Sequence, residues 1–131
     1  MPEAAVKKKR PPLWLNISLF NLPVPGRVSI LHRISGAALF LALPWLLFLL
    51  DNSLASPERY ARVQQHLNHP LAQLAVLGLL WAYAHHFCAG IRHLLLDLHV
   101  GIDLQSARAS ARAVLGASLA LTLLFGWVLL W

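Results

Sequence analysis

Three long apolar runs dominate the chain, and each is long enough to cross a lipid bilayer. They predict membrane-spanning helices over residues of about 28–50, 71–98 and 113–131. At 1.5 Å per residue, these helices are roughly 34, 42 and 28 Å long, against a hydrocarbon core of about 30 Å. The predicted fold class is therefore an all-α membrane protein, with three transmembrane helices in residues 28–131 behind an N-terminal arm, residues 1–27.

Polar and helix-breaking residues separate these runs. The arm is rich in proline, with Pro23 and Pro25 close to the first span, and proline interrupts a continuous helix. Residues 51–70 contain three turn-like clusters, at 51–53, 56–57 and 68–70. We expect an extramembrane loop there, with one amphipathic turn around residues 58–65.

Composition and charge restrict the class of protein further. The chain has 131 residues, of which 58% are hydrophobic and 12% charged, a composition typical of one membrane domain. Part of its net charge of +6 comes from a short run at residues 7–10, and no basic stripe interleaved with aromatic residues follows. Nucleic acid is therefore not a predicted partner. The single cysteine, Cys88, excludes a disulfide within the chain, and the lack of a Cys-x-x-Cys-His motif excludes covalent haem attachment.

Basic residues are distributed unevenly between the two sides of the predicted bundle. Because Lys and Arg are enriched in cytoplasmic loops, the more basic side predicts a cytoplasmic N-terminus and a C-terminus outside. The more basic side carries nine such residues, namely Lys7, Lys8, Lys9, Arg10, Arg27, Arg33, Arg92, Arg108 and Arg112, and the first loop carries two, Arg59 and Arg62.

A polar stripe runs through the second predicted span. His86, Gly90, His93 and Asp97 are offset by four, seven and eleven residues, so at about 100° per residue they share one narrow helical face. Ionisable side chains at membrane depth cost roughly 2.5–3.5 kcal/mol each on insertion scales. We therefore expect this face to look at protein, a cofactor or water.

A second polar stripe lies at the start of the first span. Ser29, Arg33 and Gly36 are offset by four and seven residues, with His32 to one side. Under the predicted topology the two stripes meet near the cytoplasmic side. His32, Arg33 and His93 would lie about 6–8 Å from the ends of their spans and His86 about 18 Å deep.

This arrangement favours a haem over a small metal ion. His86 and His93 are about 10 Å apart along one helix, so they cannot both ligate one small ion. A haem needs one axial imidazole from this helix, a second from elsewhere, and cationic donors for its propionates. Simpler roles remain open, because His86 or the adjacent His85 could hydrogen-bond a neighbouring helix and Arg33 could extend to the membrane surface.

Two motifs at these positions resemble a known family. Ser29-Ile-Leu-His-Arg-Ile-Ser-Gly36, followed later by His86-x3-Gly90-Ile-Arg-His93-x3-Asp97, resembles the cytochrome b membrane-anchor subunit of succinate dehydrogenase, respiratory complex II. The resemblance implies a subunit of the bacterial inner (cytoplasmic) membrane that holds haem b together with a second small membrane-anchor subunit. It also implies an iron–sulfur subunit and a flavoprotein subunit docked on the cytoplasmic side.

The resemblance also implies roles for individual residues. His86 matches the axial ligand of the haem iron, although His85 directly precedes it and local spacing alone leaves a choice between the two imidazoles. Ser29 and Arg33 match positions that line the ubiquinone site. His32 and His93 match positions near the haem propionates, and Arg33 is assigned to the propionates as well.

The implied function is membrane anchoring combined with electron delivery from succinate to ubiquinone. Ser29 would hydrogen-bond a quinone carbonyl, and Arg33 would stabilise the negative charge that develops on reduction. Three alternatives come from other classes: a fumarate reductase anchor working with menaquinone, an anchor without redox activity, and a small transporter using His32 and His93 as a proton relay.

Overall fold

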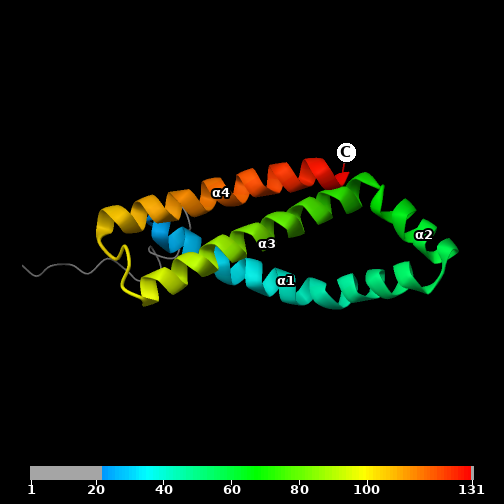
Figure 1. The fold of residues 1–131 in the computed structure, drawn as a ribbon, viewed down its shortest axis with the longest axis horizontal. Coiled ribbons are helices and arrows are strands. Elements are labelled where there is room, and N and C mark those ends of the chain that lie inside the picture. The colour runs from blue at the N-terminus through cyan, green and yellow to red at the C-terminus, as the bar shows by residue number, and fades with distance from the viewer. Residues whose placement is uncertain (1–21, 131) are drawn as a thin grey trace, which may run out of the picture.

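The computed structural model describes residues 22–130, and within that range it contains four helices and no strand. They are α1 (Val24–Ala55), α2 (Pro57–Leu67), α3 (Pro70–Asp97) and α4 (Leu104–Leu130). Three of them, α1, α3 and α4, are long and apolar enough to cross a membrane. The prediction of an all-α protein with three spanning helices is confirmed. Figure 1 shows these three as long neighbouring rods, with the short α2 joining α1 to α3 at one end.

Helix α1 extends beyond the predicted span at both ends. Pro25 does not interrupt it, because this residue lies in the first helical turn, where a missing N–H costs no hydrogen bond within the helix. At the other end, residues 51–53 are helical rather than a loop. One reason is that the side-chain amide of Asn52 donates to the carbonyl oxygen of Phe48 at 2.8 Å. Residues 1–21 of the predicted arm lie outside the described residues.

The amphipathic turn expected around residues 58–65 is the centre of a longer helix, α2, of 11 residues. Ser56 caps its start, since its hydroxyl oxygen accepts a hydrogen bond from the Arg59 backbone N–H at 3.3 Å. Pro57 occupies the first turn, where its fixed backbone angle suits the helix. The loop between the first two spans is therefore mostly helical.

Helix α4 begins nine residues before the predicted third span, at Leu104 instead of residue 113. The signal for this start is Asp103, whose Oδ1 accepts a hydrogen bond from the Ser106 backbone N–H at 2.9 Å. The preceding turn ends α3, and His99 and Gly101 adopt backbone φ angles of 61° and 69° there. These left-handed conformations reverse the chain over a few residues.

The cap at Asp103 makes the start of α4 sensitive to acid. Hydrogen bonds from the Ser106 side chain and backbone hold the pKa of the Asp103 carboxyl below its ordinary value of 3.8. Because the pKa is lower in the folded state than in the unfolded state, the cap contributes its full stability at pH values above the unfolded-state pKa. This stability is lost as the pH falls through the folded-state pKa. We expect acidification to lower the hydrogen-exchange protection of the Ser106 amide severalfold.

A matched pair of variants tests this cap. Asp103→Asn keeps an acceptor without a titrating charge, so its protection factor should not depend on pH, whereas Asp103→Ala should lose protection at every pH. Equal pH dependence of the wild type and Asp103→Asn would show that another group titrates.

Small side chains let α3 and α4 pack closely. The buried residues of α4 recur every three or four positions and are mostly small, namely Ala111, Val114, Ser118, Thr122 and Gly126. A Cβ added at Gly126 would lie 2.7 Å from Cδ1 of Leu77 on α3, so the Leu77 side chain occupies the space that a larger residue would need. Such contacts are typical of helix packing inside membranes.

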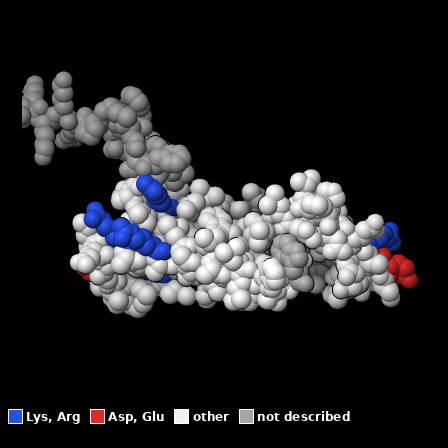
Figure 2. Space-filling model, turned by 90° about the horizontal axis from the view of Figure 1, so that it is seen from above, with Lys and Arg blue, Asp and Glu red and all other residues white. Residues whose placement is uncertain are grey.

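Helix α1 is less enclosed than the other two spans. Its buried residues are Val28 and Ser35, both in its first half, and farther along Phe40 and Leu41 are 75% and 76% exposed. In Figure 2 the charged side chains gather at the two ends of the molecule and leave an uncharged middle. This distribution suits a protein surrounded by lipid.

Candidate functional site

Three histidines predicted for the site come together between α1 and α3. The ring of His32 stacks on that of His86 with centroids 4.2 Å apart and an interplanar angle of 9°. The His32 ring also contacts the ring of His93, with centroids 5.0 Å apart and an interplanar angle of 54°. The two helices α1 and α3 are antiparallel and in contact here. The two polar stripes therefore meet, as the predicted topology requires.

The hydrogen bonds of His86 determine which of its ring nitrogens carries a proton. Its Nδ1 lies 3.0 Å from the backbone carbonyl oxygen of His32. A carbonyl oxygen can only accept, so Nδ1 must be the donor. In the neutral ring, Nε2 then keeps a free lone pair, and no hydrogen bond joins it to another described residue. This is the protonation pattern of a histidine prepared to bind a metal through Nε2.

Ser35 supports this orientation and was not singled out from the sequence. Its side chain is buried, its hydroxyl donates to the same His32 carbonyl at 2.9 Å, and its Oγ lies 3.3 Å from Nδ1 of His86. Ser35 is part of the Ser29-to-Gly36 motif. That its side chain faces α3 depends on how α1 packs against α3.

Gly36 gives the His86 ring its space. A Cβ at this position would lie 2.8 Å from Cε1 and 3.2 Å from Nδ1 of His86, so the imidazole rests directly on the α1 backbone. Gly90 is less tight, since its added Cβ would meet Nε2 of His32 at 3.7 Å, an ordinary van der Waals contact. Of the two stripe glycines, Gly36 is therefore the one against which an imidazole packs tightly.

This contact yields a prediction about the ring position. Gly36→Ala should displace the His86 imidazole by several tenths of an ångström and weaken its bond to the His32 carbonyl, because the added methyl overlaps the ring. The visible spectrum of any group bound to His86 should shift. Gly78→Ala on α3 is the matched control, since its added methyl would meet nothing within 4 Å. A shift of equal size in both variants would contradict this role of Gly36.

His85 lies on a different side of α3 from His86. It is fully buried, and its ring stacks on Trp81 with centroids 5.2 Å apart. Neither ring nitrogen has a hydrogen-bond partner in the described part of the chain. His85 and Arg92 are seven residues apart and so share a helical face, and both side chains are buried, as are Ala82 and Ala89.

Arg92 links α3 to the first turns of α4. The side chain is 6% exposed, its Nε donates to the Ser110 hydroxyl at 3.0 Å, and one terminal nitrogen donates to the Ala107 carbonyl at 3.3 Å. From the sequence, this arginine is part of the Gly90-to-His93 motif and one of the basic residues on the predicted cytoplasmic side. Its hydrogen bonds to Ala107 and Ser110 could not be predicted, because the predicted third span began only at residue 113.

Ser29 and Arg33 stand beside the histidine cluster on α1. They are one helical turn apart, Ser29 half-buried and Arg33 exposed, so their side chains share the same face. No hydrogen bond connects either side chain to His32, His86 or His93 among the described residues. Asp97, the last member of the α3 stripe, is exposed at the end of its helix.

Comparison with known proteins gives the family. Residues 7–125 match the profile of the succinate dehydrogenase/fumarate reductase transmembrane subunit. The chain belongs to this family. The match takes in all of α1, α2 and α3 and most of α4.

Individual relatives narrow the description. The chain is 38% identical over 119 residues to a succinate dehydrogenase cytochrome b556 subunit of Coxiella burnetii, covering 89% of this chain and 95% of that one. Subunits of the same name from Paracoccus denitrificans and Rickettsia felis are 29% and 31% identical, over 92% and 86% of this chain and 93% and 87% of theirs. The protein is therefore a cytochrome b membrane-anchor subunit of the succinate dehydrogenase type, and it is a multi-pass membrane protein.

Proposed function

We propose that this subunit binds haem b together with a second small membrane subunit and forms part of the site where ubiquinone is reduced. In this role it passes electrons from succinate to quinone while anchoring the soluble subunits of the complex. The observation that carries the proposal is the state of His86, whose Nδ1 is fixed by the His32 carbonyl and whose Nε2 is unengaged.

The residues present fit a haem. His86 would supply one axial nitrogen, and its hydrogen bond to a backbone carbonyl fixes the ring orientation, as in many metal-binding histidines. When bound, the haem supplies a one-electron redox centre within the membrane. His85 is a poor second candidate because its ring is enclosed between helices and packed on Trp81.

His32, His93 and Arg33 would hold the propionates. The two imidazoles lie next to each other in the cluster with His86, and Arg33 follows His32 directly on the exposed side of α1. Donors of this kind neutralise carboxylates in a site of low dielectric. The three side chains would bind the propionates and balance their negative charge.

Ser29 and Arg33 would form this chain's part of the quinone site. The Ser29 hydroxyl would donate a hydrogen bond to a quinone carbonyl, and the Arg33 guanidinium would stabilise the negative charge that develops on the oxygens during reduction. Their position in the first half of α1, on the same side of the bundle as the N-terminus, would put them near electrons that arrive from the cytoplasm.

The partners proposed are those of the whole complex. The sister membrane subunit would supply the second axial ligand and cover part of α1, which exposes large side chains such as Phe40 and Leu41. An iron–sulfur subunit and a flavoprotein subunit would dock on the cytoplasmic side of the bacterial inner membrane. The nine-to-two distribution of Lys and Arg supports a cytoplasmic N-terminus.

A reduced-minus-oxidised visible spectrum of the purified complex tests the haem. We expect a b-type band after reduction by succinate, and its absence would favour the anchor without redox activity or the proton-relay transporter. The spectrum does not distinguish a haem-bearing fumarate reductase, so the same complex should be assayed for succinate-driven reduction of a ubiquinone analogue. Failure of that reaction with retention of fumarate reduction by a menaquinol would support the alternative.

A further inference from the structure

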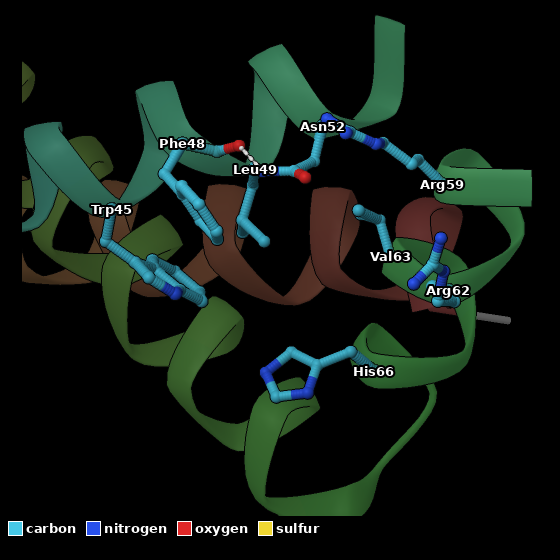
Figure 3. Close-up of a pocket in the computed structure, with 8 residues that line it drawn as sticks. All are labelled: Trp45, Phe48, Leu49, Asn52, Arg59, Arg62, Val63 and His66. Atoms are coloured by element: carbon cyan, nitrogen blue, oxygen red, sulfur yellow. Dashed lines mark hydrogen bonds between the residues drawn. The ribbon is translucent and has the colours of Figure 1, made fainter. Parts of the chain in front are cut away.

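An open pocket of about 490 Å³ lies between α1 and α2, at the end of the bundle away from the N-terminus. Both helices line it with residues at the same spacing of three, four and seven positions. The α1 side consists of Trp45, Phe48, Leu49 and Asn52, and the α2 side of Arg59, Arg62, Val63 and His66. Each set therefore forms one helical face, and the two faces look at each other (Figure 3).

The basic side chains of this pocket have no counter-charge in the described chain. No hydrogen bond or ion pair joins the guanidinium of Arg59 or Arg62 to another described residue. The nearby carboxylates, Asp51 and Glu58, are exposed and do not line the pocket. Figure 3 shows the His66 ring extending from α2 into the space between the helices and the Arg59 side chain reaching toward Asn52 on α1. Two unpaired guanidiniums on one helical face are suited to a shared anion.

The position of these arginines in the sequence adds to this argument. Between Arg33 and Arg92 the chain contains only two Lys or Arg residues, Arg59 and Arg62, and both line this pocket. The opposite wall is apolar apart from Asn52, and Trp45 lies in the second half of the long apolar helix α1. Tryptophan is favoured where lipid tails meet headgroups. A basic wall facing an apolar wall at that depth matches an amphiphile with an anionic head.

We propose that this pocket binds an anionic phospholipid of the leaflet away from the N-terminus. Arg59 and Arg62 bind its phosphate diester, and Trp45, Phe48 and Leu49 contact the start of an acyl chain. The bound lipid fastens α2 against α1, and it is independent of the haem and quinone chemistry proposed above.

The test uses the assembled complex in nanodiscs of phosphatidylcholine alone or mixed with phosphatidylglycerol. Native mass spectrometry measures which lipid remains bound, and thermal unfolding measures the stabilisation. We expect the wild type to retain phosphatidylglycerol, and Arg59→Gln with Arg62→Gln to weaken retention by about fivefold per arginine, since a basic residue near the membrane surface contributes about 1 kcal/mol.

Arg108→Gln with Arg112→Gln is the matched control, because it removes the same charge from exposed positions of α4. Equal loss in both double variants, or no preference for phosphatidylglycerol in the wild type, would overturn the proposal. So would full stabilisation by inorganic phosphate in pure phosphatidylcholine, which would identify a free anion as the ligand.

A further variant keeps the test decisive if the double arginine variant does not assemble. Leu49→Trp keeps both guanidiniums and fills the apolar wall, so it should also lower retention of phosphatidylglycerol. Unchanged retention would place the lipid elsewhere on the complex.

Discussion

Replacing His86 by alanine is expected to abolish the low-spin, six-coordinate spectrum of the haem in the assembled complex. The reason is that His86 is the histidine whose Nε2 is left unengaged while Nδ1 is held by the His32 carbonyl at 3.0 Å. Removing an axial imidazole leaves the iron five-coordinate or releases the haem altogether. Visible spectra of the purified complex, normalised to its flavin content, measure both outcomes.

The neighbouring histidine is the control for this experiment. His85 is fully buried and stacked on Trp81, so His85→Ala should leave the spectrum nearly unchanged while lowering the thermal stability through the cavity it creates. His85→Leu fills more of that space and removes two unpartnered ring nitrogens, so it should be less destabilising than His85→Ala. Loss of the haem spectrum in the His85 variants, with retention in His86→Ala, would reverse the assignment of the ligand.

The fold was largely predictable because bilayer thickness and apolar run length constrain it strongly. Span lengths identified α1, α3 and α4, but helix ends depend on local hydrogen bonds that hydropathy does not report. The Asp103 cap started α4 earlier than expected, and Asn52 helped to prolong α1. Pro25 was assigned too disruptive a role, because a proline in the first turn is compatible with a helix.

The site was predictable to the extent that it follows helical periodicity. The stripe of His86, Gly90 and His93 faces α1, where His32 lies between the two imidazoles. Periodicity assigns residues to faces of one helix, but it does not give the register between two helices. The contact of Ser35 with His86 and the bonds from Arg92 to α4 depend on that register, and so they became visible only in the structure.

Removing the Arg33 guanidinium is expected to stop electron transfer to quinone while leaving succinate oxidation intact. Arg33, which is exposed, and Ser29, which is half-buried, share one face of α1 beside the histidine cluster, where the proposed quinone site would lie. The loss of one donor that stabilises developing negative charge typically costs on the order of 10²–10³ in rate. Arg33→Leu should therefore lower succinate–quinone activity by about that factor, and Ser29→Ala should also lower it sharply.

Assays of the same enzyme preparation with two different electron acceptors separate quinone reduction from succinate oxidation. An artificial acceptor that takes electrons before the quinone should react at the wild-type rate in both variants, because in the proposed complex the flavin and iron–sulfur chemistry would lie on other subunits. Arg108→Leu on α4 and Ser53→Ala near the end of α1 remove the same groups from positions outside the polar stripe of Ser29 and Arg33, and both activities should survive in them. An arginine that only extends to the membrane surface would behave like these controls, so survival of quinone activity in an assembled Arg33→Leu complex would remove Arg33 from the quinone site.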